Sequence, residues 1–346
     1  MTLYGGFGEK FIFDRNNNDF MKIAVLGAGY LGKIHLRLIK NIPEYNLVGF
    51  YDIDTSTAKK VSQEFKVNSF DSFDNLITST DVVVVATPTL SHFECAKKAI
   101  ENKKHVFIEK PVTHSVEEAN ELLALVEKMN VKVQVGHVER FNPAFTSAIP
   151  FIKNPLFIEV HRLSSFNTRG TDVSVVLDLM IHDIDIVLSI VKSKVTQIST
   201  SGVAVASKNP DITNARIEFE NGCVANLTAS RVSLKKMRKS RIFQKDAYIS
   251  IDFLNEKTEI ISLSDSNSWN PFATNIEIDS SGNKKSIHFK QPKIVKRNAI
   301  QEELRTFALS IIDNKTTIIT LAQGCEALKI AHTIMHKINE RITSSF

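Results

Sequence analysis

Residues 27–32 have the sequence Gly27-Ala28-Gly29-Tyr30-Leu31-Gly32, with the spacing G-x-G-x-x-G. A short apolar run at residues 22–26 precedes the glycines, and apolar residues at helical spacing follow them. A second apolar run lies at residues 47–51. The patterns predict strand, tight turn, helix and strand in that order, which is one βαβ unit. In this setting the glycines indicate a dinucleotide site, because the turn and the helix N-terminus can receive a pyrophosphate.

One carboxylate refines the prediction of the cofactor. Asp52 follows the second strand, 20 residues after Gly32, where an acidic side chain accepts hydrogen bonds from the adenosine ribose. A carboxylate there repels a 2'-phosphate, so NAD is favoured over NADP. The alternatives are a glycine-rich turn without a ligand and a surface or capping role for Asp52. The predicted cofactor-binding residues of this unit are Gly27, Gly29, Tyr30, Leu31, Gly32 and Asp52.

Strands and helices continue to alternate up to Gly136. Four consecutive valines at residues 82–85 are typical of a parallel strand that is covered on both faces. The alternation predicts a doubly wound parallel sheet, the Rossmann fold, over residues 21–142. Residues 1–20 are expected to form a flexible extension. The further predicted strands are 81–86, 105–108 and 131–135, and the further predicted helices are 91–102 and 116–129.

Beyond residue 142 the pattern changes. Prolines mark a linker, and a long helix predicted at residues 173–191 is followed by successive strands. Asn221-Gly222 indicates a hairpin, because both residues tolerate positive φ. Residues 143–346 are therefore expected to form an α+β domain with a large, open, mostly antiparallel sheet, so the whole chain is of the α/β class. The predicted strands are 195–205, 215–219, 223–229, 247–253, 257–263, 275–278 and 285–289, and the closing helices are 299–312 and 321–338.

Polar residues at the carboxyl ends of two strands are candidates for the ligand crevice of such a sheet. Thr87-Pro88 ends the valine strand, and His92 opens the next helix. Glu109-Lys110-Pro111 follows the strand at residues 105–108. A lysine there can hydrogen-bond the oxygen of an alcohol or carbonyl while hydride moves, which stabilises developing negative charge. A solvated lysine in a turn and a helix-initiating threonine are the alternatives.

A second polar group lies in the predicted helix at residues 173–191. Asp178, His182 and Asp185 occupy positions i, i+4 and i+7, which share one face of an α-helix. Histidine titrates near neutral pH, so His182 can take a hydroxyl proton during oxidation and return it during reduction. We expect Asp178 to orient the imidazole and to support its charged form. These residues and Lys110 are the predicted catalytic group, and no metal site is predicted.

Together, the glycine fingerprint, Thr87-Pro88 with His92, Glu109-Lys110-Pro111 and Asp178-x-x-x-His182 resemble the Gfo/Idh/MocA oxidoreductase family. The resemblance covers nearly the whole chain from Met21. It implies a Rossmann domain, bound NAD(H) or NADP(H), a lysine and histidine catalytic pair, and oligomerisation through the C-terminal sheet as a homodimer or homotetramer. It also implies that Thr87, Pro88, His92, Glu109 and Lys110 line the cofactor site. The family's glycine before the histidine is replaced here by Met180 or Ile181.

Within the family, two stretches are similar to members that act on nucleotide-linked amino sugars, the UDP-N-acetylglucosamine 3-dehydrogenases. The stretches are residues 135–143 and Arg169-Gly170-Thr171-Asp172. This similarity implies contact with an anionic or polyhydroxylated substrate. Structural salt bridges are the alternative for the arginines. The predicted substrate-binding residues are Arg140, Asn142, Arg169, Asp172 and His182.

Composition excludes several classes. The chain has 346 residues, 43% of them hydrophobic and 23% charged, so disordered and fibrous classes are excluded. It carries no apolar run that could span a membrane and no signal peptide, and its three cysteines lack metal-site spacing. A cytoplasmic protein is expected. The net charge of +5 is mild.

Much of the positive charge lies in one basic stretch, residues 231–245. A solvated strand edge or loop is the first interpretation, and contact with a diphosphate or an acidic partner subunit is the second. Nucleic acid is the third interpretation, because no recognised binding motif accompanies the charge. The basic residues are Arg231, Lys235, Lys236, Arg238, Lys239, Arg241 and Lys245.

The sequence thus favours an NAD-dependent oxidoreductase that transfers hydride between a secondary hydroxyl of a sugar, preferably a UDP-amino-sugar, and NAD. One alternative is an NAD-assisted glycosidase of the same fold, which regenerates its cofactor in each cycle. Another is a dinucleotide-sensing regulator without catalysis. Retention of both Lys110 and His182 argues against the regulator.

Overall fold

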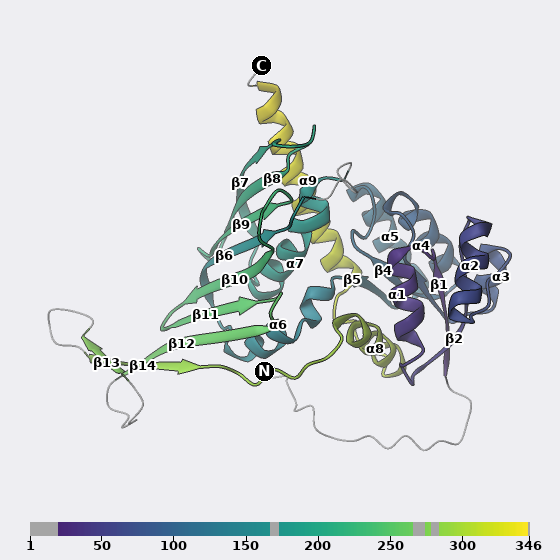
Figure 1. Ribbon diagram of the computed structural model, residues 1–346, viewed down its shortest axis with the longest axis horizontal. Helices are drawn as coiled ribbons and strands as arrows, with labels where there is room; N and C mark the ends of the chain where they lie inside the picture. Colours follow the sequence, from purple (N-terminus) through teal and green to yellow (C-terminus); the bar gives the residue numbers. More distant parts are fainter. Residues whose placement is uncertain (1–19, 167–172, 266–273, 278–283, 345–346) are drawn as a thin grey trace.

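The computed structural model describes residues 20–166, 173–265, 274–277 and 284–344. The strands form two sheets with a layer of helices between them (Figure 1). The predicted fold class is confirmed: a parallel Rossmann sheet precedes a large, mostly antiparallel sheet. Among the helices of these ranges, none combines the length and the apolar composition that a membrane span requires.

The first sheet has five parallel strands in the order β2-β1-β3-β4-β5. Its third strand, the run of valines, is buried along its whole length, as expected for a strand with helices on both faces. The strand bounds are β1 (Met21–Leu26), β2 (Tyr45–Tyr51), β3 (Val82–Val85), β4 (His105–Glu109) and β5 (Val133–Gly136).

Helices cover both faces of this sheet. On one face α1 and α2 share an apolar cluster with α8, and on the other face α4 and α5 share one with the start of α9. The last helices of the chain therefore return to the first sheet, and the division of the chain at residue 142 stays a prediction. The bounds are α1 (Tyr30–Ile39), α2 (Thr55–Phe65), α3 (Phe73–Thr78), η1 (Thr89–Ser91), α4 (His92–Glu101), α5 (Val116–Met129), α8 (Ala299–Ile312) and α9 (Leu321–Ser344).

The second sheet has nine strands within the described ranges, in the order β13-β14-β12-β11-β10-β6-β9-β8-β7. Only β6 and β9 are parallel neighbours. The bounds are β6 (Pro155–Leu163), β7 (Val195–Val203), β8 (Ile212–Phe219), β9 (Val224–Ser230), β10 (Met237–Gln244), β11 (Ala247–Asp252), β12 (Lys257–Asp265), β13 (Thr274–Glu277) and β14 (Lys284–Lys290).

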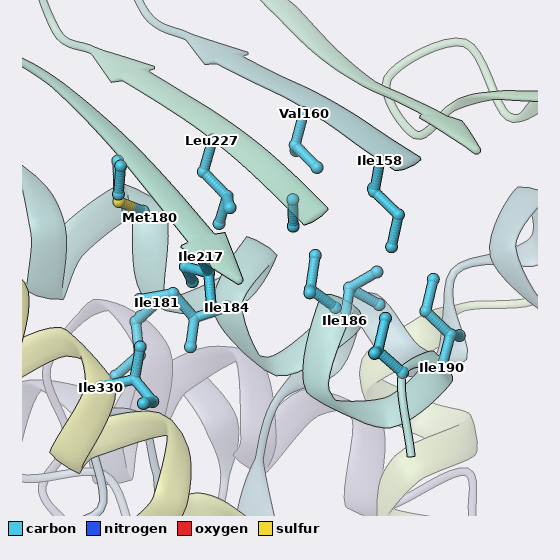
Figure 2. Close-up of a cluster of buried hydrophobic side chains, with 14 of the residues drawn as sticks. Ile158, Val160, Met180, Ile181, Ile184, Ile186, Ile190, Ile217, Leu227 and Ile330 are labelled. Atoms are coloured by element: carbon cyan, nitrogen blue, oxygen red, sulfur yellow. The ribbon is translucent and has the colours of Figure 1, made fainter. Parts of the chain in front are cut away.

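One face of this sheet packs against α6 (Pro143–Ala148), α7 (Ile181–Ile190) and α9. Figure 2 shows the contact, with Ile158 and Leu227 from the strands pointing toward isoleucines of α7 such as Ile184. Removing each such side chain from water contributes roughly 1.5–3 kcal/mol. This burial holds α7 firmly against the sheet, and with it the polar residues near its N-terminus.

Two strands of this sheet are not predicted by the sequence patterns. The expected linker contains α6, the short helix η3 (Ile149–Phe151) and then β6. The basic stretch, which we expect to form a strand edge or a loop, contains β10, which pairs with β6 and β11. The expectation of a sheet edge is therefore wrong for β10, whereas residues 231–236 lie outside the strands. Lys239 and Arg241 are partly exposed and lie 3.1 and 3.7 Å from carboxylates of neighbouring strands, so these charges are paired on the surface of the sheet.

The single helix predicted at residues 173–191 is also corrected. It consists of a π-helical turn, η4 (Val176–Met180), followed by α7. A π turn is rare, and such turns are often found at functional sites. Asp178 lies in this turn, and His182 lies in the regular helix that follows it.

Candidate active site

The glycine loop between β1 and α1 has the geometry of a dinucleotide cradle. Gly27 has a φ of 87°, and a Cβ there would lie 2.7 Å from the Ala86 carbonyl oxygen. A Cβ at Gly32 would lie 1.9 Å from the Gly27 carbonyl oxygen. Both positions therefore require glycine for the fold itself. At Gly29 a Cβ would meet no atom within 4 Å, so the protein's own packing does not explain that glycine, whereas close approach of a ligand would.

The N-terminus of α1 supports the same interpretation. Gly29 is the N-cap, and no side chain caps the free amide groups of the first turn, which includes Tyr30 and Leu31. Such amides and the positive end of the helix favour an anion. The ring of Tyr30 is 83% exposed. The residues present thus fit the pyrophosphate of a dinucleotide.

Asp52 is fixed beside this loop. Its Oδ2 accepts a hydrogen bond from the Ala28 amide at 2.7 Å, and its Oδ1 accepts one from the Asp54 amide at 2.9 Å. These two bonds hold the carboxylate at the carboxyl end of β2, where the sequence places the ribose contact. Each oxygen retains a further lone pair for a ligand hydroxyl.

The ends of β3 and β4 are joined by His92. Its ring nitrogens lie 2.9 Å from the Thr87 carbonyl oxygen and 2.8 Å from the Pro111 carbonyl oxygen. The ring is buried, so these contacts give His92 a structural role, and its predicted contact with the cofactor stays a prediction. Pro88 follows Thr87 in the same turn, and Pro111 follows a cis peptide bond. Thr87 Oγ1 is buried beside the Cys95 side chain.

Lys110 reaches across to the second domain. Its Nζ donates to the Asp178 carbonyl oxygen at 2.9 Å and lies 3.6 Å from Asp178 Oδ1. Burial lowers the pKa of Lys110, and the carboxylates of Asp178 and Glu109 partly offset that effect. The ammonium group is thus held at the edge of the sheet by oxygens of the η4 turn.

Behind Lys110, Glu109 is held by a residue that the sequence interpretation did not include. His35 Nε2 lies 2.7 Å from Glu109 Oε1, and both side chains are buried. Burial alone would raise the pKa of Glu109, but the hydrogen bond and charge of His35, together with Lys110, lower it. The other oxygen of Glu109 accepts from the Lys110 amide at 3.3 Å. Glu109 therefore positions the Lys110 backbone, and its own contact with a cofactor stays a prediction.

His182 lies close to these groups. Burial and the positive charges of Lys110 and Arg162 lower the pKa of His182 well below its usual value, so the imidazole is neutral at neutral pH. Its Nδ1 is buried without a partner in the described ranges. The ring of His137, which belongs to the stretch 135–143 but is not among the predicted substrate-binding residues, lies edge-on to it at a centroid distance of 6.5 Å.

The expected hydrogen bond between Asp178 and His182 is absent from the described contacts, in which Asp178 pairs with Lys110 instead. The third acid of the predicted face, Asp185, accepts two hydrogen bonds from Arg140 at 2.6 and 2.8 Å. The aspartates thus hold cations rather than the imidazole. The physical reason is charge, because the Lys110 ammonium beside Asp178 attracts a carboxylate more strongly than a neutral imidazole does.

The predicted substrate contacts meet different outcomes. Arg140 is engaged by Asp185, as described above, and Asn142 caps α6 while donating to Glu139 and to the Phe253 carbonyl oxygen. These contacts are structural, and substrate contact by either residue stays a prediction. Arg169 and Asp172 lie outside the described residues.

A buried charge network forms the wall of the site next to His182. The Arg162 guanidinium, 3% exposed, donates to Asp183 at 2.8 Å and to Glu139 at 2.8 Å. Arg238 of β10 lies 3.5 Å from the same Glu139 carboxylate and is half exposed. Sequence patterns do not predict this network, because its members come from four separate elements. Within the described ranges no cluster of histidine, cysteine, aspartate and glutamate could hold a metal ion.

Comparison with known proteins gives consistent matches. Residues 21–137 match the model of an oxidoreductase family with an NAD-binding Rossmann fold, and residues 136–249 match the GFO/IDH/MocA C-terminal domain. The UDP-N-acetylglucosamine 3-dehydrogenase of Acidithiobacillus ferrooxidans is 35% identical over 69% of this chain and 76% of its own. The NAD⁺-dependent scyllo-inositol 2-dehydrogenase of Bacillus subtilis is 30% identical over 62% of this chain and 68% of its own.

Solved structures agree with these matches. The structure of the Acidithiobacillus ferrooxidans enzyme superposes with a TM-score of 0.82 at 29% identity, covering 92% of this chain and 98% of that one. A scyllo-inositol dehydrogenase of Lactobacillus casei with bound NAD(H) and scyllo-inositol has a TM-score of 0.73 at 20% identity, covering 93% of this chain and 98% of that one, which shows the shared fold.

Proposed function

Because the chain belongs to the GFO/IDH/MocA oxidoreductase family, we propose that it is an NAD-dependent dehydrogenase of a sugar hydroxyl, with a UDP-linked amino sugar as the favoured substrate. One observation carries the proposal: Lys110, at the end of β4, meets the helix turn that precedes His182, with Nζ 2.9 Å from the Asp178 carbonyl oxygen. This contact, between residues 68 positions apart in the sequence, supports the pairing of Lys110 with His182, which lies four residues after Asp178. The similarity to the UDP-N-acetylglucosamine 3-dehydrogenase supports the choice of substrate.

The described side chains suit oxidation of a secondary alcohol. His182 is neutral and accepts the hydroxyl proton at Nε2, because Nδ1 is its buried nitrogen. Lys110 donates a hydrogen bond to the same oxygen and stabilises the negative charge that develops on it. Asp178 holds the ammonium group in place of the expected role of orienting the imidazole. When bound, NAD supplies the acceptor for the hydride.

The preference for NAD over NADP depends on Asp52. Its carboxylate is held beside the glycine loop by two backbone amides. A 2'-phosphate on the adenosine ribose would bring a second negative charge close to it, which is unfavourable. The cradle itself, formed by Gly27, Gly29 and Gly32, is common to both cofactors.

The bare face of the large sheet supports a homodimer or homotetramer. An apolar row crosses five strands on this face, because its members lie directly opposite one another in the ladder. Three of them are 38–61% exposed, and in the described ranges no helix covers them. A second copy of the chain would bury the row in a self-complementary contact. The row consists of Phe157, Phe243, Tyr248, Ile261 and Phe289.

The proposed assembly is tested by light scattering of Phe243→Glu after size exclusion. We expect smaller particles than for the wild type, because a charge in the middle of an apolar interface opposes association. Ile312→Glu, at an exposed position at the end of α8, is the matched control. A wild-type particle that is monomeric, or an unchanged size in Phe243→Glu, would contradict the assembly.

The cytoplasmic location stays a prediction. Cys95, Cys223 and Cys325 are all unpaired, which is the usual state of cysteines in a reducing compartment and supports it.

The reaction is tested with UDP-N-acetylglucosamine, UDP-glucose, scyllo-inositol and myo-inositol as separate substrates with NAD. We expect net formation of NADH and, by mass spectrometry, a product that has lost two hydrogen atoms, most rapidly with UDP-N-acetylglucosamine. Cleavage of a glycosidic bond without net NADH would favour the NAD-assisted glycosidase. Absence of NADH with every substrate would contradict the proposal.

A further inference from the structure

His137 is a second histidine at the carboxyl edge of the first sheet. It follows β5 directly, and β5 pairs with β4, the strand that ends at Glu109 and is followed by Lys110. The side chain is 1% exposed. Its ring is perpendicular to that of His182, with an interplanar angle of 89° and a centroid distance of 6.5 Å. Position alone therefore places His137 next to the reacting groups.

Both ring nitrogens of His137 lack a hydrogen-bond partner in the described ranges. A neutral imidazole always carries one N–H donor and one acceptor nitrogen. Leaving both unpaired in the interior is unfavourable, and native proteins rarely do so without a functional reason. The nearest charged groups do not serve as partners, because Arg140 and Asp185 are bonded to each other.

His182 also has a buried nitrogen without a partner, Nδ1, but its other nitrogen, Nε2, is the one that we propose to meet the substrate. The adjoining wall differs from His137, since each charge of Arg162, Asp183 and Glu139 has a partner there. The contrast indicates that a bound ligand supplies the partners that His137 lacks.

The chemistry of His137 indicates which part of a ligand it contacts. Burial lowers the pKa of the ring, and the charges of Asp185 and Arg140 act on it in opposite directions, so it is neutral at neutral pH. One donor and one acceptor match a hydroxyl or an amide. A neutral ring offers no positive charge to offset the cost of burying an anion. A phosphate or carboxylate is therefore a poor partner.

We propose that His137 hydrogen-bonds a neutral substituent, a hydroxyl or acetamido group, on the carbon next to the one that is oxidised. The inference rests on the proposed function, because it requires that His182 and Lys110 hold the reacting oxygen. His137 is then a residue that selects the substrate and orients the sugar ring. It takes no proton from the reacting carbon's hydroxyl.

Three substitutions test this role. His137→Phe removes both nitrogens and keeps a ring, His137→Asn keeps an amide near the place of Nδ1, and His137→Gln keeps one near the place of Nε2. His332→Phe is the matched control, because His332 also has a buried nitrogen without a partner but lies on α9. For each variant, kcat and KM are measured with UDP-N-acetylglucosamine and UDP-glucose, together with the melting temperature and the Kd for NAD.

We expect His137→Phe to lower kcat/KM by about tenfold or more, the effect of losing one hydrogen bond or more to the substrate. Either His137→Asn or His137→Gln should restore much of it, whereas the NAD Kd and the melting temperature should stay near wild type. The change should differ between UDP-N-acetylglucosamine and UDP-glucose, because their neighbouring groups differ. Unchanged kcat/KM in His137→Phe, or equal loss in all three variants, would overturn the inference.

A binding measurement separates this inference from the proposed reaction. The wild type and His137→Phe are titrated with UDP-N-acetylglucosamine in the presence of NADH by calorimetry. Binding that weakens in the variant, with no turnover by the wild type, would retain the contact and overturn the reaction. Turnover by the wild type with equal binding in both proteins would retain the reaction and overturn the contact. Absence of binding in both would overturn both.

Discussion

Two neighbouring regions treat buried polar groups in opposite ways. In the wall formed by Arg162, Asp183 and Glu139, every charge is hydrogen-bonded to another. At the edge of the first sheet, His137 and His182 are equally deep but have nitrogens without partners. Paired groups stabilise a fixed shape. The nitrogens of His137 and His182 lack partners at the proposed substrate site, so we expect the wall to maintain the fold and these histidines to act on the substrate.

The largest effect should come from Lys110→Met, at the edge of the first sheet. We expect kcat/KM to fall by about 10³-fold or more, because a positioned proton donor and charge contribute roughly this much to a rate. The melting temperature and the Kd for NAD should change little. Steady-state kinetics and fluorescence titration check this, with the exposed Lys315→Met as the control. Equal turnover in Lys110→Met would exclude the lysine from catalysis.

A substitution in the wall should lower the stability of the fold. Arg162→Met leaves Asp183 and Glu139 buried without their partner, which typically costs about 3–5 kcal/mol of unfolding free energy. Denaturant unfolding measures the loss. Arg297→Met, which removes a half-exposed ion pair with Glu302, should cost no more than about 1 kcal/mol. If the two variants are equally stable, the wall is not the stabilising region.

A smaller change is expected for substitution of Asp52, the residue predicted to select NAD over NADP. Asp52→Asn should lower the ratio of kcat/KM for NAD to that for NADP by about 10- to 100-fold, since one like-charge contact near a surface is worth about 1.4 to 3 kcal/mol. Asp54→Asn, in the same turn but at the N-cap of α2, should leave the ratio unchanged. A constant ratio in Asp52→Asn would show that other groups select the cofactor.

The pH dependence of kcat/KM tests the two proposed catalytic groups, His182 and Lys110, together. Oxidation needs neutral His182 and charged Lys110, and the pKa of each is lowered. The acid limb should therefore lie below pH 6.5 and the alkaline limb below pH 10.5, each with about a tenfold change per pH unit. Stopped initial-rate assays across pH locate both limbs. An acid limb above pH 6.5 would contradict a buried neutral histidine.

The smallest effect tests whether a buried group without a hydrogen-bond partner always belongs to the proposed site. Glu303 of α8 is buried, and both its carboxyl oxygens lack partners in the described ranges. Burial and the charge of Glu109 raise the pKa of Glu303 well above its usual value, so the folded protein holds a proton that the unfolded chain releases. This favours the folded state at acid pH, and the advantage is lost as pH rises from about 4.5 through the folded pKa.

Glu303→Gln should therefore match the wild type in stability at acid pH and exceed it at neutral pH, on the order of 1 kcal/mol. Its kcat should equal that of the wild type. Thermal unfolding at several pH values measures the difference, with the exposed Glu326→Gln as the control. A large loss of kcat in Glu303→Gln would show that Glu303 contributes to catalysis.

Much of the first sheet follows from local sequence, and less of the second does. Helices α5 and α8 have the predicted bounds, because capping residues and apolar spacing act over a few residues. Strand β6 escapes prediction because Arg162 occupies a buried position of its alternating pattern and Pro155 begins it. Strand β10 also escapes prediction, because its buried face carries a polar residue, Ser240, beside Ile242.

The residues of the candidate site also differ in how far local sequence predicts them. Lys110 and His182 are predictable from motifs, because each stands in a local pattern with a known chemistry. The residues that contact this pair and line the site are not predictable in this way. Arg162 and Asp183 meet across 21 residues, and His137 faces His182 across the interface of two domains. The contact of Asp178 with Lys110 joins residues 68 positions apart, which no local pattern shows.

The central claim is that this site moves hydride from a sugar carbon to NAD with Lys110 and His182 in place. The most direct measurement uses UDP-N-acetylglucosamine carrying deuterium on carbon 3 and follows the label by mass spectrometry of the reduced cofactor. The account predicts deuterated cofactor from the wild type and from Lys315→Met, and almost none from Lys110→Met. Reduced cofactor without deuterium, or labelled cofactor at equal rate from Lys110→Met, would contradict it.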